Sequence, residues 1–207
     1  MGVKVKICGI TNLEDALASV FAGCDSLGFM FYRRSPRYIS PERARNIINI
    51  IPKEIVKIGV FVNTPEKNIK QIAKFCKLDI LQFHGNESPE FCRRFKGYKI
   101  IKAFRVKDKI NLKQIKKYKV FAYLFDTFVE STPGGTGKKF NWQLIKHLHG
   151  VEQPIFLSGG LNCRNVKKAV NYLHPDWVDV CSAVEVFPGK KDHVKVKDFV
   201  KAAKGKN

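Results

Sequence analysis

The hydrophobic positions of the chain fall into eight short runs, and most of these runs are followed by a segment with helical spacing. The runs cover residues 3–8, 25–31, 55–62, 79–83, 98–104, 120–125, 154–157 and 177–180. Short apolar runs bounded by turn residues are typical of buried strands, and strands that alternate with helices form a parallel sheet. The pattern therefore predicts repeated strand–helix units along the whole chain.

Several of the expected helices begin with a capping residue followed by proline. Ser40-Pro41 places a capping hydroxyl before a proline at the first helical position, and the same signal recurs at 64–65 and 88–89. Two further helices are expected to begin at Thr11 or Asn12 and at Asn162 or Arg164. The last two are expected over residues 108–117 and 192–203.

Eight units in 207 residues give about 26 residues for each unit. This predicts the α/β class and a single closed (β/α)8 TIM barrel, with residues 1–207 forming one catalytic domain. A doubly wound open sheet is the alternative, but it usually has fewer strands. A dinucleotide site would also show GxGxxG after the first strand, where this chain has Cys8-Gly9-Ile10-Thr11.

Composition and charge narrow the class of protein further. Hydrophobic residues make up 44% of the chain and charged residues 27%, which is globular, and no run approaches the roughly 20 apolar residues of a spanning helix. We therefore expect a cytoplasmic protein with no membrane partner. The net charge of +20 is spread along the chain without a block of five or six like charges. We therefore expect no nucleic-acid partner, although the excess favours small anions.

The six cysteines offer no metal-binding pattern. No two of them lie within five residues of each other, so CxxC pairs and zinc knuckles are absent from the sequence. We interpret them as free thiols, most of them buried. The five histidines are also scattered. We therefore expect no metal site.

Polar side chains stand at the ends of several predicted strands, where active sites of this fold lie. These side chains belong to Cys8, Gln82, His84, Asp126 and Asp179, and Arg37 follows in the loop after the second strand. Each has a structural interpretation as a buried filler, a turn cap or a solvated loop charge. Their shared location makes them candidates for proton transfer and for binding a carboxylate.

Two loops suggest a phosphate site. Gly159-Gly160 lies between the seventh strand and its helix, and Cys181-Ser182 follows the eighth strand. Loops seven and eight together are the frequent phosphate site of this fold. The glycine-rich segment 133–139 resembles a P-loop superficially but lacks the GxxxxGK[ST] spacing. We interpret it as a lid after the sixth strand.

Taken together, these residues resemble the phosphoribosylanthranilate isomerase family. The matching motifs follow one another in the family's order along nearly the whole chain. The matching motifs are Lys6-Ile7-Cys8-Gly9, Ser35-Pro36-Arg37-Tyr38-Ile39-Ser40, Gln82-Phe83-His84-Gly85, Phe125-Asp126, Gly134-Gly135-Thr136-Gly137 with Phe140-Asn141-Trp142, Ser158-Gly159-Gly160-Leu161 and Val178-Asp179-Val180-Cys181-Ser182-Ala183-Val184-Glu185.

The resemblance implies an isomerase of tryptophan biosynthesis that needs no metal or organic cofactor. It implies the Amadori rearrangement of N-(5'-phosphoribosyl)anthranilate, with Cys8 as general base, Asp126 as general acid and Arg37 holding the anthranilate carboxylate. Further substrate contacts are expected from Gln82, His84, Gly159, Gly160, Asp179, Cys181 and Ser182. We expect a monomer or a homodimer.

Two positions depart from the family pattern, both in the expected phosphate loop. Cys181 stands where serine is common and Ala183 where glycine is common. The backbone N–H groups survive both changes, but a hydroxyl contact from position 181 is lost. The rival enzyme is a pentulose-phosphate epimerase, which would need metal-binding His and Asp residues on several strand ends, where this chain offers only His84.

Overall fold

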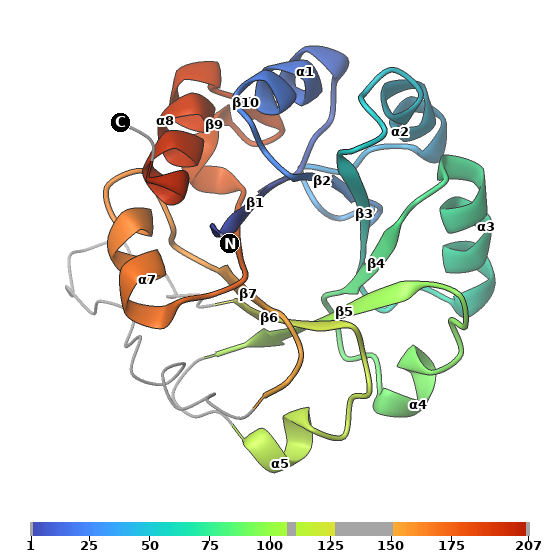
Figure 1. Cartoon of the computed structure of the whole chain (residues 1–207). Coiled ribbons are helices and arrows are strands. Elements are labelled where there is room, and N and C mark those ends of the chain that lie inside the picture. Colours follow the sequence, from blue (N-terminus) through green and yellow to red (C-terminus); the bar gives the residue numbers. More distant parts are fainter. Residues whose placement is uncertain (1, 107–110, 127–150, 206–207) are drawn as a thin grey trace.

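Eight parallel strands close into a barrel, with β1 paired to β8 (Figure 1). The computed structural model describes residues 2–106, 111–126 and 151–205. The strands are β1 Lys4–Cys8, β2 Ser26–Met30, β3 Val56–Phe61, β4 Ile80–Phe83, β5 Lys99–Arg105, β6 Ala122–Asp126, β7 Ile155–Ser158 and β8 Trp177–Val180. The predicted (β/α)8 barrel is confirmed, and the open-sheet alternative is wrong.

Side chains from alternate positions of the strands fill the inside of the barrel. One buried cluster takes Ile58, Ile80, Ile101, Leu124 and Phe156 from five neighbouring strands. Trp177 of β8 completes this layer, its ring stacked on Phe156 with 4.8 Å between centroids. Because strand side chains alternate between two faces, the residues two positions further along each strand also face inward, one layer higher.

The helices surround the barrel and bury a second, larger apolar cluster against the outer faces of the strands (Figure 1). Asn12, Ser40 and Ser88 each accept a hydrogen bond from a backbone N–H three residues later, which confirms these predicted caps. The helices are α1 Leu13–Phe21, α2 Pro41–Ile48, α3 Glu66–Cys76, α4 Pro89–Cys92, α5 Leu112–Ile115, α7 Val166–Leu173 and α8 His193–Lys204.

Two predicted helices form but begin later than their predicted capping residues imply. The side chain of Asn162 accepts a hydrogen bond from the N–H of Arg164 at 2.9 Å, which closes a local turn, so α7 begins only at Val166. Thr64 Oγ1 bonds to the carbonyl of Val62 instead of capping a helix, and α3 begins at Glu66. A side chain that satisfies a nearby backbone group in a turn is not available as a helix cap.

A short hairpin after β8 was not predicted. A single 3-10 turn, Ser182–Val184, leads into strands β9 Glu185–Phe187 and β10 Lys190–Lys191. The predicted lid at 133–139 lies outside the described residues, as do positions 108–110 of the predicted fifth helix. In the described part of the chain, no helix combines the length and apolar character needed to cross a membrane.

Candidate active site

The inward alternation brings the predicted strand-end residues to one mouth of the barrel. Cys8 stands two positions after Lys6 on β1, and Asp126 two positions after Leu124 on β6, so both face the inside at the carboxyl ends of their strands. Three steps separate β6 from β1 around the eight-stranded ring. Cys8 and Asp126 therefore approach a ligand in the mouth from different sides.

A buried ion pair lies directly below Cys8. The Nζ of Lys6 is 2.8 Å from Oδ1 of Asp179, and Ser158 Oγ donates to the other carboxylate oxygen at 3.2 Å. The side chain of Lys6 has no exposed surface, and that of Asp179 is 5% exposed. Burial alone would lower the pKa of Lys6, but Asp179 and Cys8 raise it, so the lysine stays charged.

Cys8 is an acidic thiol in this setting. A hydrogen bond from the Cys181 thiol and the charge of Lys6 lower the pKa of Cys8 to about 6, against the opposing effects of burial and Asp179. The pKa of Cys181 is raised well above its ordinary value by its hydrogen bond to Cys8 and by burial. The pair therefore holds its negative charge on Cys8, as a base or a nucleophile requires.

Gly28 of β2 leaves the space that the Cys8 sulfur occupies. A side chain at this position would place its Cβ 2.8 Å from Cys8 Sγ and 3.1 Å from Cys8 Cα. The second of these atoms belongs to the backbone of β1, which cannot move aside without disturbing the barrel. The sequence predicted β2 but gave no sign of this close approach.

Asp126 lies at the end of a short hydrogen-bonded chain. Its Oδ2 is 3.1 Å from Nε2 of His84, and His84 Nδ1 is 3.0 Å from Nε2 of Gln82. Because the amide nitrogen of Gln82 donates, His84 Nδ1 accepts, and Nε2 carries the proton that points at Asp126. This chain orients the carboxyl group at the mouth. The three residues that the sequence singled out on β4 and β6 are thus brought together.

Arg37 is fixed to the hairpin that follows β8. Its Nε and Nη2 donate to the carboxylate of Glu185, the latter at 2.6 Å. Glu185 also accepts from the fully buried Lys191 at 2.9 Å, and Lys191 donates to the carbonyl of Cys181 at 3.1 Å. This network ties the loop after β2 to the loop after β8. It holds the guanidinium in one orientation at the rim of the mouth.

The two predicted phosphate loops follow neighbouring strands. Gly159 and Gly160 adopt φ values of 87° and 64°, a left-handed backbone that other residues rarely adopt. The side chain of Asn165 donates to the carbonyl of Gly160 at 2.9 Å and fixes this turn. Ser182 is exposed in the 3-10 turn after β8. Loops seven and eight thus lie side by side, as an anion site shared between them requires.

Several residues of the site carried no assigned role at the level of sequence. Glu185 and Lys191 belong to the unpredicted hairpin. Glu185 pairs with Arg37, far away in the chain, and Lys191 supports Glu185. Arg105 ends β5, where it is exposed and in register with Asp126. Its position at a strand end was a usable signal, because Cys8, Gln82, Asp126 and Asp179 were found by the same criterion.

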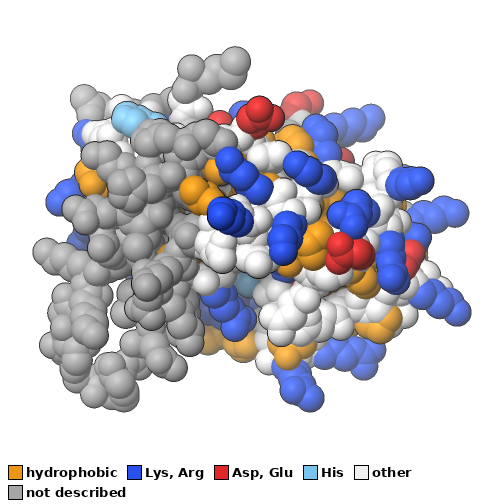
Figure 2. All heavy atoms as spheres, turned by 90° about the horizontal axis from the view of Figure 1, so that it is seen from below, with side chains coloured by type: hydrophobic (Ala, Val, Ile, Leu, Met, Phe, Trp, Pro, Cys, Tyr) orange, Lys and Arg blue, Asp and Glu red, His pale blue; other side chains and the backbone are white. Residues whose placement is uncertain are grey.

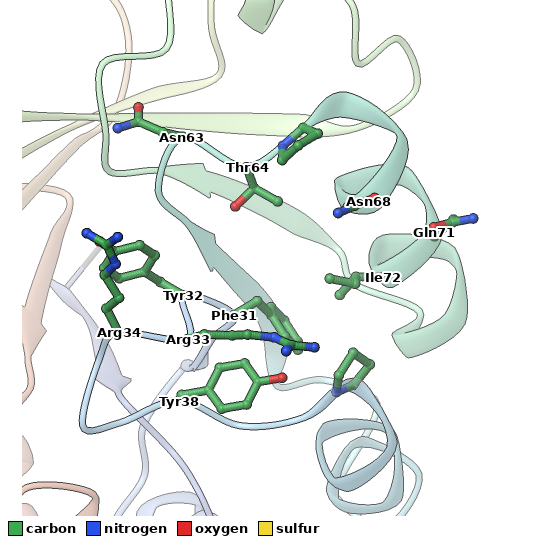
Figure 3. Close-up of a pocket in the computed structure, with 12 residues that line it drawn as sticks. Phe31, Tyr32, Arg33, Arg34, Tyr38, Asn63, Thr64, Asn68, Gln71 and Ile72 are labelled. Atoms are coloured by element: carbon green, nitrogen blue, oxygen red, sulfur yellow. The ribbon is translucent and has the colours of Figure 1, made fainter.

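A surface cavity of about 530 Å³ lies beside the mouth, between the loops after β2 and β3 (Figure 3). Tyr32, Arg34, Tyr38, Asn63 and Asn68 are among its lining residues, and neither Cys8 nor Asp126 is. It is therefore separate from the strand-end cluster. Within residues 2–106, 111–126 and 151–205, no three His, Cys, Asp or Glu side chains are grouped to hold a metal ion.

Comparison with known proteins decides the family. The family model described as N-(5'phosphoribosyl)anthranilate (PRA) isomerase matches residues 5–202. The chain belongs to this family. The phosphoribosylanthranilate isomerase of Pelobacter propionicus is 48% identical over 202 residues, which cover 98% of this chain and 96% of that protein. The corresponding isomerase of Geobacter sulfurreducens is 46% identical over 203 residues, covering 98% and 99%.

Solved structures of family members have the same barrel. The crystal structure of phosphoribosyl anthranilate isomerase from Thermotoga maritima matches with a TM-score of 0.89 and 46% identity, covering 98% of this chain and 99% of that one. Another family structure, with a TM-score of 0.86, 44% identity and the same coverage, is a complex with reduced 1-(o-carboxyphenylamino)-1-deoxyribulose 5-phosphate. Family membership excludes the pentulose-phosphate epimerase as the account of this chain.

Proposed function

We propose that the chain catalyses the Amadori rearrangement of N-(5'-phosphoribosyl)anthranilate to 1-(2-carboxyphenylamino)-1-deoxyribulose 5-phosphate, a step of tryptophan biosynthesis. Family membership supports the reaction. The observation that carries its assignment to residues is the placement of an acidic thiol on β1 and a carboxyl group on β6 at one barrel mouth. The reaction needs one base and one acid at separate points of the sugar.

Asp126 is the proposed general acid. Ring opening needs a proton on the ribose ring oxygen as the C1'–O bond breaks, and it leaves an iminium ion at C1'. The carboxyl group of Asp126 delivers that proton. His84, which is 3.1 Å from Asp126 Oδ2, orients the carboxyl group and stabilises the carboxylate that forms.

Cys8 is the proposed general base. The iminium ion acidifies the hydrogen on C2', and the Cys8 thiolate removes it to give an enolamine that tautomerises to the ketone. Lys6 below the thiolate keeps this charge stable inside the barrel. Asp179 is 5% exposed and held by Lys6, so we propose that it supports the site through that lysine.

Arg37 and the loops after β7 and β8 are the proposed binding groups. Nε and Nη2 of Arg37 are engaged by Glu185, so we assign Nη1 to the substrate carboxylate. The phosphate is assigned to the backbone of Gly159, Gly160, Cys181 and Ser182, in the loops that follow the neighbouring strands β7 and β8. Gln82 and His84 are assigned to the mouth through their hydrogen-bonded chain to Asp126.

The test is direct. Purified protein is mixed with phosphoribosylanthranilate, and the loss of the substrate's fluorescence is followed with and without a chelator. We expect rapid loss in both cases, since we propose a single catalytic domain over residues 1–207 that needs no metal and no cofactor. No loss of fluorescence overturns the reaction, and sensitivity to the chelator overturns the metal-free mechanism.

The oligomeric state has its own measurement. A Thermotoga maritima relative is described as a dimeric phosphoribosylanthranilate isomerase from which monomers were generated. We propose that this chain is a monomer or a homodimer in the cytoplasm. Sedimentation at several protein concentrations distinguishes the two, and a larger assembly contradicts both.

A further inference from the structure

Two thiols meet at the seam where β1 and β8 close the barrel. The register pairs Lys6 with Asp179 and Ile7 with Val180, so Cys8 and Cys181 are the next neighbours in line. Lys6 and Asp179 face the same side, as their 2.8 Å ion pair shows, and Cys8 and Cys181 each stand two residues later. Both thiols therefore lie on the inner face, where each shifts the pKa of the other.

We propose that Cys8 and Cys181 are a modification site, at which a hydroperoxide oxidises the two thiols to a reversible disulfide. The remaining cysteines among the described residues lack this arrangement, since Cys24, Cys76 and Cys92 are buried elsewhere in the fold and Cys163 is exposed in the loop after β7.

The backbone geometry suits a disulfide. Neighbouring strands lie about 4.8 Å apart, and disulfides join residues whose Cα atoms are roughly 4.4–6.8 Å apart. Cys181 Sγ also lies close to the chain just after β1, because a Cβ at Gly9 would be 3.0 Å from it. On this spacing, rotation of the two side chains should bring the sulfurs within bonding distance.

The chemistry balances in two steps. The Cys8 thiolate attacks one oxygen of hydrogen peroxide, the O–O bond breaks, and hydroxide leaves, so that Cys8 becomes a sulfenic acid. Cys181 then gives up its proton and attacks the Cys8 sulfur; the S–O bond breaks, and hydroxide leaves and takes up a proton as water. Two thiols and one peroxide give one disulfide and two waters, and a dithiol reductant restores both thiols.

The surrounding charges favour the first step. Lys6 lies below Cys8, and the Nζ of Lys191 is 3.9 Å from Cys181 Sγ. Thiolates next to cations are the cysteines that react with peroxide at neutral pH. Oxidation would consume the proposed base, so we expect turnover to be lost with the thiols; this consequence, unlike the disulfide itself, rests on the proposed function.

The experiment is mass spectrometry of the full chain after exposure to a few-fold excess of hydrogen peroxide. The expected product is about 2 Da lighter than the reduced protein. After alkylation and trypsin digestion, residues 7–33 should be linked to residues 169–190. A dithiol should return both the original mass and the original turnover. A wild-type protein that forms no such linkage, or that links Cys163 instead, overturns the proposal.

Variants separate the role of the second thiol. In Cys181→Ser, Cys8 has no resolving partner, so excess peroxide should carry it to the sulfinic acid, about 32 Da heavier, and a dithiol should not restore turnover relative to the untreated variant. The matched control, Cys163→Ser, should behave as wild type. If Cys181→Ser recovers as completely as wild type, Cys181 is not the partner. A disulfide that forms without loss of turnover supports the modification site and contradicts the assignment of Cys8 as base.

Discussion

At the scale of single residues, one proton on Cys8 decides whether the proposed base is active. The pKa of Cys8 is near 6 because Cys181 donates a hydrogen bond to it and Lys6 lies below it. The thiolate is the form that removes a proton, so kcat/KM should fall as the pH drops through about 6. A profile of kcat/KM between pH 5 and 8 measures this limb.

Removing the hydrogen-bond donor should move that limb. Cys181→Ala should raise the pKa of Cys8 and shift the limb upward by about one to two pH units. Cys181→Ser keeps an O–H donor and should shift it less. The rate at which iodoacetamide alkylates Cys8 should shift with pH in the same way. A limb that stays near pH 6 in Cys181→Ala would show that this contact does not set the base.

Loss of the proposed acid or base should lower kcat. Cys8→Ala and Asp126→Ala should each lower kcat by about 10²–10⁴-fold and change KM far less, because both groups act on protons that move only in the chemical steps. Asp126→Asn should be as damaging as the alanine variant, since an amide cannot deliver the proton. Cys163→Ala is the control and should retain wild-type kcat. Near-normal turnover in Cys8→Ala would show that Cys8 is not the general base.

Binding should respond to Arg37 in a different way. Arg37→Ala should raise KM about 10- to 150-fold, the worth of one charge-assisted contact of roughly 1.5–3 kcal/mol, with a smaller effect on kcat. Arg37→Lys keeps the charge but loses the two-nitrogen contact with Glu185, so it should recover only part of the affinity. Steady-state kinetics test both variants, and an unchanged KM with collapsed turnover would contradict the anchoring role.

At the scale of elements, the seam between β1 and β8 depends on the buried pair of Lys6 and Asp179. Lys6→Met should destabilise the fold by about 3–5 kcal/mol, because it leaves the Asp179 carboxylate buried without its cation. The double variant Lys6→Met/Asp179→Leu should cost less than the sum of the single changes. Urea unfolding measures all three variants, and additive effects would mean that the pair is not coupled.

The elements also show what the sequence can predict and why the rest escapes it. Predictions succeeded where the structure depends on residues close in sequence. The apolar runs predicted the eight strands, and Ser40 caps its helix as expected. Local reasoning failed at Asn162, whose side chain closes a turn instead of starting a helix. The pairing of Arg37 with Glu185 depends on how distant loops meet, which no spacing along the chain reveals.

The candidate site divides in the same way. Cys8 and Asp126 could be found because both stand at the ends of predictable strands. Their residue types, with the family resemblance, then indicated their roles. The sequence could not reveal why Cys8 is acidic. Its contact with Cys181 exists only because β1 pairs with β8 where the barrel closes.

At the scale of the whole molecule, the charge excess bears on how the substrate arrives. Figure 2 shows Lys and Arg side chains scattered over the described part of one face, with few acidic side chains between them. The proposed substrate carries a phosphate and a carboxylate, and the chain carries a net charge of +20. Its kcat/KM should therefore fall as salt rises through about 0.1 M, where the screening length is roughly 10 Å.

The control for this prediction is a viscosity series at low salt, which shows whether encounter limits kcat/KM. If kcat/KM does not change with salt, the positive charge does not speed the encounter of substrate and enzyme.

Gly28 limits how this barrel can be altered by laboratory evolution. A library that places even alanine at position 28 forces a methyl group to within 2.8 Å of the Cys8 sulfur and 3.1 Å of the β1 backbone. Such clones keep every proposed functional side chain yet must displace the base from its place at the mouth. In a selection for growth without tryptophan they should be lost together with clones that lack Cys8, so a glycine with no chemistry of its own should be as intolerant of change as the base it accommodates.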